Sequence, residues 1–221
     1  MKNVPIKGII PPIVTPMSAD ESVNIPELRN QIERQIAGGV HGIFPFGTNG
    51  EGYILSMKEK EEVLEATIDQ VKGRIPVYAG TGCISTRDTI YMSKRAEEMG
   101  ADVLSIITPS FALASQKELY DHYCEVAKHV SIPIVLYNIP ARTGNKLLPE
   151  TVGKLARDVD VIMGAKDSSG DIENLDSPAD SQYRFTGLID YVSGQIHILA
   201  VPHRHDGSTV TFSVLPIFLR I

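Results

Sequence analysis

The sequence predicts an α/β fold, a TIM (β/α)8-type barrel whose last units are incomplete or irregular. The first observation is that short apolar runs of strand length alternate with longer amphipathic runs of helical spacing. Such alternation is typical of a parallel sheet covered by helices, either doubly wound or closed into a barrel. The second is that no GxGxxG motif follows the first apolar run, which weakens the dinucleotide-binding alternative. The third is that hydroxyl, amide and charged residues gather directly after the apolar runs, where a barrel carries its active site.

The elements follow one another in a regular order. The expected parallel strands, consecutive neighbours around the barrel, are 8–14, 42–47, 75–80, 102–107, 133–138 and 161–166. The expected helices are 26–39, 56–73, 85–100, 115–130 and 148–159. In the first helix, Leu28, Ile32 and Ile36 recur at helical spacing before a glycine pair that marks a stop. At the start of the second, Ser56 and Glu59 stand in the register of a capping box.

The C-terminal part of the chain breaks this pattern. We expect residues 1–175 to hold the first six βα units and residues 176–221 to form a divergent tail, typical of a truncated or frame-disrupted copy. The tail offers one or two strands, "GQIHILAV" (194–201) and "STVTFSVLPIF" (208–218), but no helix of barrel length. A barrel without its last covering helices leaves sheet edges and apolar surface exposed. We therefore expect the chain to be unstable or to depend on self-association.

Composition excludes several classes of partner. The formal net charge of −6, from 27 acidic and 21 basic residues, gives no long-range attraction for nucleic acid or anionic membranes. The two cysteines, Cys83 and Cys124, have no CxxC spacing, which disfavours a disulfide framework or a structural zinc site. The N-terminus is too broken by proline for a signal-peptide core, and no 18-residue apolar run occurs. We expect a cytoplasmic protein without a metal site.

Lys166 is the first candidate catalytic residue, because it ends the apolar run 161–166. A charged lysine at the end of a buried strand costs free energy unless its amine is neutralised, paired with an acidic group or used in chemistry. Its amine becomes a nucleophile when an apolar site or a cationic neighbour lowers its pKa from about 10.4, and it then forms an imine with a carbonyl substrate. The alternative is that Lys166 forms an ion pair with Asp167 or Glu51 and only stabilises the loops at this end of the barrel.

Three further candidates follow other strands. Tyr137 ends the preceding strand and can relay protons beside a cation, although a tyrosine there is more commonly a core residue. The "GTNGE" run (47–51) offers backbone N–H groups to a carboxylate, with Thr48 adding a hydroxyl, but is also a good turn. Arg142 in "PARTG" can clamp a second carboxylate or simply contact solvent.

Taken together, these runs resemble the dihydrodipicolinate synthase/N-acetylneuraminate lyase family, the pyruvate-handling class I aldolases. Over about residues 5 to 175, the resemblance is carried by "TPM", "GTNGE", "TPSF" followed by "SQKELYDHY", "YNIPARTG" and "GAKDSSGD". It implies a TIM barrel with a C-terminal helical extension, a homo-oligomer (dimer or tetramer) and no metal or organic cofactor. It also implies pyruvate and an aldehyde or keto acid as substrates.

The resemblance also assigns roles. Lys166 becomes the Schiff-base lysine for pyruvate and Tyr137 the proton-relay tyrosine, with Thr48 as the third catalytic residue. The implied activity is that of a carbon–carbon lyase, most like the 4-hydroxy-tetrahydrodipicolinate synthase of lysine biosynthesis.

The substrate-binding residues are assigned in the same way. Gly47, Thr48 and Asn49 correspond to the loop that binds the pyruvate carboxylate. Arg142 corresponds to the arginine that holds the carboxylate of aspartate semialdehyde in the synthase branch.

Some positions depart from the synthase pattern. Ser110 and Phe111 stand where the synthases have two tyrosines, and Asn49 replaces their usual threonine. The "KDSSGD" run looks more like the branch that acts on 2-keto-3-deoxy sugar acids. The alternatives are therefore a 2-keto-3-deoxy sugar acid or 4-hydroxy-2-oxoglutarate aldolase, or an inactive remnant or binding protein.

Overall fold

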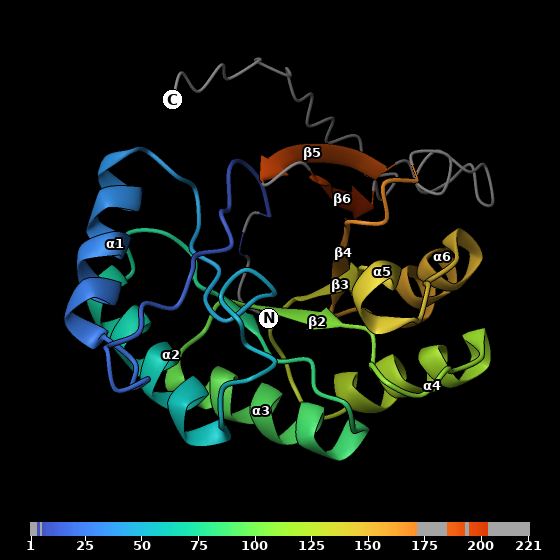
Figure 1. The fold of residues 1–221 in the computed structure, drawn as a ribbon. Coiled ribbons are helices and arrows are strands. Elements are labelled where there is room, and N and C mark those ends of the chain that lie inside the picture. The colour runs from blue at the N-terminus through green and yellow to red at the C-terminus, as the bar shows by residue number, and fades with distance from the viewer. Residues whose placement is uncertain (1–3, 5, 172–184, 193–194, 203–221) are drawn as a thin grey trace.

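In the computed structural model, the helices form an arc outside a set of strands (Figure 1). The structure describes residues 4, 6–171, 185–192 and 195–202. The helices are α1 (Ile25–Ala37), α2 (Met57–Val71), α3 (Thr86–Met99), α4 (Gln116–Ala127), α5 (Pro140–Thr143) and α6 (Pro149–Asp158). The strands are β1 (Tyr78–Gly80), β2 (Val103–Ile107), β3 (Ile134–Asn138), β4 (Ile162–Asp167), β5 (Phe185–Val192) and β6 (Gln195–Pro202).

The parallel strands are neighbours in chain order, as predicted. β1 pairs with β2, β2 with β3 and β3 with β4, all parallel. The two segments expected as the first strands add to this series through single parallel bridges, Pro12 with Phe44 and Ile43 with Val77. They are shorter than predicted because prolines interrupt them, at positions 11, 12 and 45. A proline has no N–H to donate to a sheet ladder, so extended pairing cannot propagate through these segments.

Two apolar cores lie on opposite faces of the strands. The larger joins outward strand residues such as Leu104 and Leu136 to helix residues such as Leu28 and Met92. The smaller contains no helix residue; its buried members are Ile6, Phe44, Tyr78, Val103 and Val135. Since successive strand residues point to opposite faces, the second core fills the inside of the barrel. Burial of each such side chain stabilises the fold by about 1.5–3 kcal/mol relative to exposure.

The helices begin where the sequence places their caps. The predicted capping box is present: the Ser56 Oγ accepts from the Glu59 N–H, and the Glu59 carboxylate accepts from the Ser56 N–H at 2.8 Å. Ser115 and Glu118 form the same box at the start of α4. The short helix α5 was not predicted, and it interrupts the run that carries Arg142. Among the described residues, no helix is both long and apolar enough to cross a bilayer.

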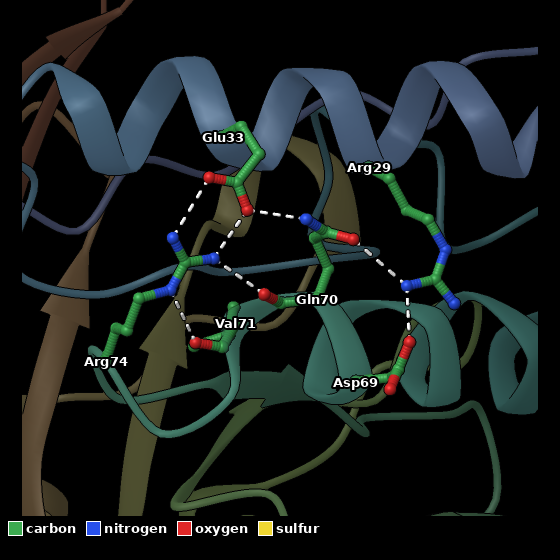
Figure 2. A network of polar contacts seen from close by, with 6 residues as sticks. All are labelled: Arg29, Glu33, Asp69, Gln70, Val71 and Arg74. Carbon is green, nitrogen blue, oxygen red and sulfur yellow. Dashed lines mark hydrogen bonds and ion pairs between the residues drawn. The ribbon is translucent and has the colours of Figure 1, made fainter.

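A polar network joins α1 to the end of α2 (Figure 2). The Arg74 guanidinium donates to both carboxylate oxygens of Glu33, at 2.5 and 3.0 Å. Gln70 donates to the same carboxylate at 2.5 Å and accepts from Arg29 at 3.1 Å. Arg29 also forms an ion pair with Asp69 at 2.5 Å. The network fixes the first two helices against each other on the outside of the barrel.

The parallel series ends after β4. β6 pairs antiparallel with β4, and β5 pairs antiparallel with β6, so the sheet order is β1-β2-β3-β4-β6-β5. The predicted run 194–201 overlaps β6, whereas β5 was not predicted because Gly187 and Asp190 are disfavoured in strands. The expected strand 208–218 and the expected boundary at 175 both lie outside the described residues.

Candidate active site

Lys166 and Tyr137 stand side by side on neighbouring strands. They are direct register partners in the parallel pair of β3 and β4. This pairing depends on an irregularity, since Ile134 pairs with Ile162 but Val135 pairs with Gly164. The extra residue moves β4 along by one position, and a one-residue shift turns side chains to the other face of a sheet. Lys166 therefore shares the inner face with Tyr137.

Two aromatic rings surround the Lys166 amine. Its Nζ lies 4.1 Å from the centroid of the Tyr137 ring and 4.9 Å from that of Phe44. Two glycines leave room for the Phe44 ring, because a Cβ at either Gly47 or Gly80 would lie 3.1 Å from a ring atom of Phe44. The amine thus lies at the C-terminal end of the barrel, above a largely apolar floor.

The Tyr137 hydroxyl is the centre of a second set of contacts. It lies 3.4 Å from the Thr48 Oγ1, at the limit of a hydrogen bond. Burial raises the pKa of Tyr137, while hydrogen bonds from Thr48 and Ser168 and the positive charge of Arg142 lower it. Burial dominates, so the phenol stays protonated near neutral pH and can donate or pass a proton.

The glycine loop that carries Thr48 is folded tightly against the end of strand 8–14. The Glu51 N–H donates to the Thr48 carbonyl, and the Gly52 N–H donates to the Gly47 carbonyl, each at 3.2 Å. The buried Thr15 hydroxyl donates to the Gly50 carbonyl at 2.6 Å. A Cβ at Gly52 would lie 2.0 Å from the Phe46 carbonyl oxygen, so this position needs glycine. Thr48 and Asn49 are half-buried on this loop.

The Asp167 carboxylate accepts hydrogen bonds from β3 and from the loop that follows β4. It accepts from Asn138 Nδ2 at 2.6 Å, and from the N–H and hydroxyl of Ser169 at 2.7 and 2.5 Å. Adjacent strand residues point to opposite faces, so this carboxylate lies on the other side of β4 from the Lys166 side chain. The Asp167 carboxylate thus has hydrogen-bond donors of its own on β3 and on the loop after β4.

Arg142 and Phe111 lie on the two neighbouring loops at the same end of the barrel. Arg142 is exposed on α5 and is close enough to Tyr137 for its charge to lower the Tyr137 pKa. Phe111 has a φ of 81° and is 95% exposed. The Ala112 N–H donates to the Ser110 carbonyl at 3.1 Å, which makes Phe111 the centre of a γ-turn of the rare, strained kind.

The structure thus brings Lys166, Tyr137 and Thr48 together, and places Gly47, Asn49 and Arg142 around them. Sequence reasoning missed Phe44 and Ser168. Ser168 stands in the "KDSSGD" run directly after Lys166, so its position at a strand end is the signal for it, whereas nothing in the sequence marks Phe44. Within the residues that the structure describes, no group of three or more His, Cys, Asp or Glu side chains could hold a metal ion.

Comparison with known proteins decides the family. Residues 5–189 match the family model described as the dihydrodipicolinate synthetase family. The chain belongs to the dihydrodipicolinate synthetase family. This confirms the resemblance on which the assignment of Lys166 and its neighbours rests, and it confirms the predicted barrel class, since the structural neighbours are barrels of this family.

Relatives of this dihydrodipicolinate synthetase family member include enzymes named 4-hydroxy-tetrahydrodipicolinate synthase. The protein of Methanopyrus kandleri is 41% identical over 169 residues, which make up 76% of this chain and 56% of that protein. The protein of Syntrophus aciditrophicus is 46% identical over 169 residues, 76% of this chain and 57% of that one. The chain therefore spans a little over half the length of these curated relatives.

A solved structure extends the similarity to three dimensions. The dihydrodipicolinate synthase of Acinetobacter baumannii, crystallised in complex with pyruvate, superposes with a TM-score of 0.75 at 40% sequence identity. The superposition covers 77% of this chain and 58% of that one. The two proteins thus share the fold over about three quarters of this chain.

Proposed function

We propose that the protein is a Schiff-base-forming, pyruvate-dependent lyase, most like 4-hydroxy-tetrahydrodipicolinate synthase, which joins pyruvate to aspartate semialdehyde. The observation that carries the proposal is the position of the Lys166 amine, 4.1 Å from the Tyr137 ring on the inner face of the barrel. The names of the relatives and the pyruvate complex of one of them support the same substrate. Catalytic roles for Lys166, Tyr137 and Thr48 are part of this proposal.

The first stage is imine formation. The deprotonated Lys166 amine attacks C2 of pyruvate and forms a carbinolamine, which loses its hydroxyl as water and becomes the imine. The Tyr137 phenol donates the proton that the leaving hydroxyl needs and takes one back from the nitrogen. Thr48 orients that phenol through the 3.4 Å contact between the hydroxyls. The loop of Gly47, Thr48 and Asn49 holds the pyruvate carboxylate.

The second stage forms the carbon–carbon bond. Transfer of a proton from C3 to the nitrogen of the imine gives an enamine, whose C3 attacks the aldehyde carbon of the second substrate. The aldehyde oxygen takes up a proton and becomes a hydroxyl. Arg142 holds the carboxylate of the semialdehyde bidentately. The amine of the substrate then attacks the imine carbon, closes a ring and releases the Lys166 amine.

Two other functions have specific support. Asn49, Phe111 and the "KDSSGD" run favour an aldolase for 2-keto-3-deoxy sugar acids or 4-hydroxy-2-oxoglutarate. The divergent tail favours a remnant that binds pyruvate without turnover. We would incubate the protein with ¹³C-labelled pyruvate and either aspartate semialdehyde, glyceraldehyde or glyoxylate, and follow new carbon–carbon bonds by NMR. Product from the semialdehyde alone supports the synthase; product only from the other aldehydes contradicts it, and no product with any of them favours the remnant.

The cellular setting is proposed on the same basis. We infer that the protein acts in lysine biosynthesis in the cytoplasm, as a dimer or tetramer, and that residues 1–175 hold the first six βα units while 176–221 form a divergent tail. The exposed apolar side chains of Phe111 and Leu113 support self-association, because they lie on one loop at 95% and 81% exposure. Sedimentation equilibrium tests the oligomeric state directly.

A further inference from the structure

A buried pair of polar side chains lies directly behind the candidate site. On β3, Asn138 follows Tyr137 directly. On β4, its register partner Asp167 follows Lys166 directly. The two side chains are 4% and 5% exposed, and the Asn138 Nδ2 donates to one Asp167 carboxylate oxygen at 2.6 Å. Successive strand residues point to opposite faces, so this hydrogen bond joins the outer faces of the two strands whose inner faces carry the candidate catalytic residues.

The remaining polar atoms of the pair bind the chain on either side of it. The second Asp167 carboxylate oxygen accepts from the N–H and the hydroxyl of Ser169, at 2.7 and 2.5 Å. The Asn138 Oδ1 accepts from the Leu147 N–H at 3.0 Å. A carboxylate only accepts hydrogen bonds, whereas an amide donates through its nitrogen and accepts through its oxygen. The donors and acceptors therefore match in only one arrangement, with the carboxylate on β4 and the amide on β3.

The pair favours one register of β4 over the alternative. In the observed register, Asp167 stands opposite Asn138 and Lys166 stands opposite Tyr137. A regular ladder continued from Ile134 and Ile162 would put Asp167 opposite Ile139, whose side chain has no donor. A buried carboxylate oxygen that loses its donor is costly, so the hydrogen bond from Asn138 opposes this slip.

The turn that Asp167 holds also reaches the Tyr137 phenol. The Ser168 N–H donates to the Asn138 carbonyl at 2.8 Å, and its side chain is 6% exposed. Burial raises the Tyr137 pKa, and a hydrogen bond from the Ser168 side chain opposes that shift. Ser168 lies between Asp167 and Ser169, which are themselves joined by two hydrogen bonds. The contacts of the pair therefore determine where the Ser168 hydroxyl meets the phenol.

We propose that Asn138 and Asp167 are a positioning pair for the proton relay at Tyr137. Their hydrogen bond fixes the register in which Tyr137 and Lys166 face each other. Through the turn after β4, it also holds Ser168 against the phenol. The pair acts from the outer face of the strands, so neither side chain has to touch the substrate. The effect on catalysis rests on the proposed function, whereas the hold on the register and the turn does not.

Exchange of the two side chains tests the pairing. Asp167→Asn alone sets two amides against each other, and either orientation of the new amide loses the bond to Asn138 or those to Ser169. Asn138→Asp alone leaves two carboxylates with no donor between them. In the double variant Asn138→Asp/Asp167→Asn, the new amide at position 167 donates to the new carboxylate at position 138. Its oxygen still accepts from Ser169, and the carboxylate still accepts from Leu147, so every bond of the pair re-forms.

The rate of imine formation separates positioning from general destabilisation. Each single variant should slow the trapping of pyruvate at saturation by about tenfold to a hundredfold, because small displacements of reacting groups are costly. The half-saturating pyruvate concentration should stay near the wild-type value, since the loop that carries Thr48 is unchanged. The double variant should regain most of the wild-type rate. A folded Asp167→Asn with the wild-type rate, or a double variant no faster than the single ones, would overturn the positioning role.

Lys146→Gln is the matched control. It removes an ion pair between Lys146 and Asp171, 2.9 Å in length, from the same turn without changing either member of the pair. This variant should trap pyruvate at the wild-type rate. A loss of rate in Lys146→Gln as large as that in Asp167→Asn would show that any disturbance of the turn has the same effect, and would contradict a specific role for the pair.

Ser169→Ala guards against a variant that fails to fold. It removes one donor to Asp167 at the half-buried turn and leaves the bond from Asn138 intact, so it should slow trapping by a smaller factor than Asp167→Asn. Hydrogen exchange of the amides in 168–171, measured on the full chain by mass spectrometry, should accelerate in both variants and return toward the wild-type rate in the double variant. Unchanged exchange in Ser169→Ala would overturn the hold on the turn.

The two measurements distinguish failure of this proposal from failure of the proposed function. A wild-type chain that traps no pyruvate would refute the proposed function and with it the role of the pair in catalysis. Hydrogen exchange would then decide alone whether Asn138 and Asp167 hold the turn. A wild-type chain that is trapped normally, with exchange and rates unaffected in every variant, would refute the positioning pair and leave the proposed function standing.

Discussion

Tyr137 and Lys166 are register partners on adjacent parallel strands, and the Lys166 Nζ lies 4.1 Å from the centre of the Tyr137 ring. The pairing exists because β4 gains one residue on β3 between Ile134 and Val135. In a regular ladder continued from Ile134, Lys166 would stand opposite Asn138 and would face away from the inside of the barrel. A local irregularity of the sheet thus places the proposed nucleophile next to the proposed proton relay.

Replacement of Tyr137 by phenylalanine should slow turnover by roughly 10²–10⁴-fold, because the phenol is the group that moves protons during imine formation and breakdown. The matched control is Tyr123→Phe, which removes a buried hydroxyl that donates to the Ile106 carbonyl in the outer core. That change should lower stability and leave kcat nearly unchanged. Similar kcat values for Tyr137→Phe and wild type, measured in steady-state assays, would remove Tyr137 from the mechanism.

The α1–α2 network should make stability fall in acid. Hydrogen bonds from Arg74 and Gln70 lower the pKa of the Glu33 carboxyl from 4.5 to about 2. Because the pKa of Glu33 is lower in the folded chain than in the unfolded chain, the ionised carboxylate stabilises the fold. This stabilisation is complete at pH values above the unfolded pKa of 4.5, and it is lost as the pH falls through the folded pKa of about 2. Thermal melts of Glu33→Gln should show a flatter pH dependence between those limits. The difference should shrink at high salt, because the network is exposed; parallel profiles for both proteins would contradict this.

The buried His122 should cause a second loss of stability in acid, at a higher pH than the loss caused by Glu33. Burial lowers its pKa from 6.5 to about 4, its Nδ1 lies 2.9 Å from the Thr86 hydroxyl, and its buried Nε2 has no hydrogen-bond partner. The unfolded chain binds a proton near pH 6.5 and the folded chain only near pH 4, so stability is lost as the pH falls between these values. The loss amounts to about 3 kcal/mol.

Denaturant titrations at pH 7, 5 and 4 test this loss. His122→Leu should abolish most of the decrease between pH 7 and pH 4, because leucine fills the site without titrating. His129→Gln, at an exposed histidine just after α4, should keep the wild-type profile. An unchanged profile in His122→Leu would show that another group controls stability in this range.

The isolated chain should self-associate or melt at low temperature. Phe111 and Leu113 present exposed apolar surface, and the sequence of 176–221 predicts no helices to cover the last strands. Leu113→Ser should reduce the associated fraction in light scattering, whereas Lys117→Ser, at an exposed residue of the adjacent helix, should not. A cooperative melt together with a monomer peak at high concentration would contradict the prediction.

Most of the barrel was predictable because its signals are local. The helix caps at Ser56 and the strand order follow from patterns within one element or between neighbours, and both appear in the structure. The residues Lys166, Tyr137 and Thr48 were predictable as strand-end positions, since strand ends of a parallel sheet meet at one edge. Their roles stay a prediction.

What could not be predicted depends on contacts between distant segments. The register shift beside Met163 has no signature in the run "VIMGAKD", because it is defined only against β3. The antiparallel pairing of β6 with β4 likewise depends on a partner strand and not on its own pattern. The sequence predicts Phe44 only as an ordinary strand residue, and its place beneath Lys166 depends on contacts with distant segments, namely the Lys166 amine 4.9 Å from its ring and the two glycines packed against that ring.

Trapping with pyruvate and borohydride tests the central claim most directly. Borohydride reduces an imine between Lys166 and pyruvate to a stable secondary amine, so the chain should gain the mass of one reduced pyruvate. Peptide mapping should place that mass on Lys166, and Lys166→Ala should abolish it, while Lys60→Ala, which removes a buried lysine from α2, should not. A wild-type chain that gains no mass, or a Lys166→Ala chain trapped as well as the wild type, would contradict the account.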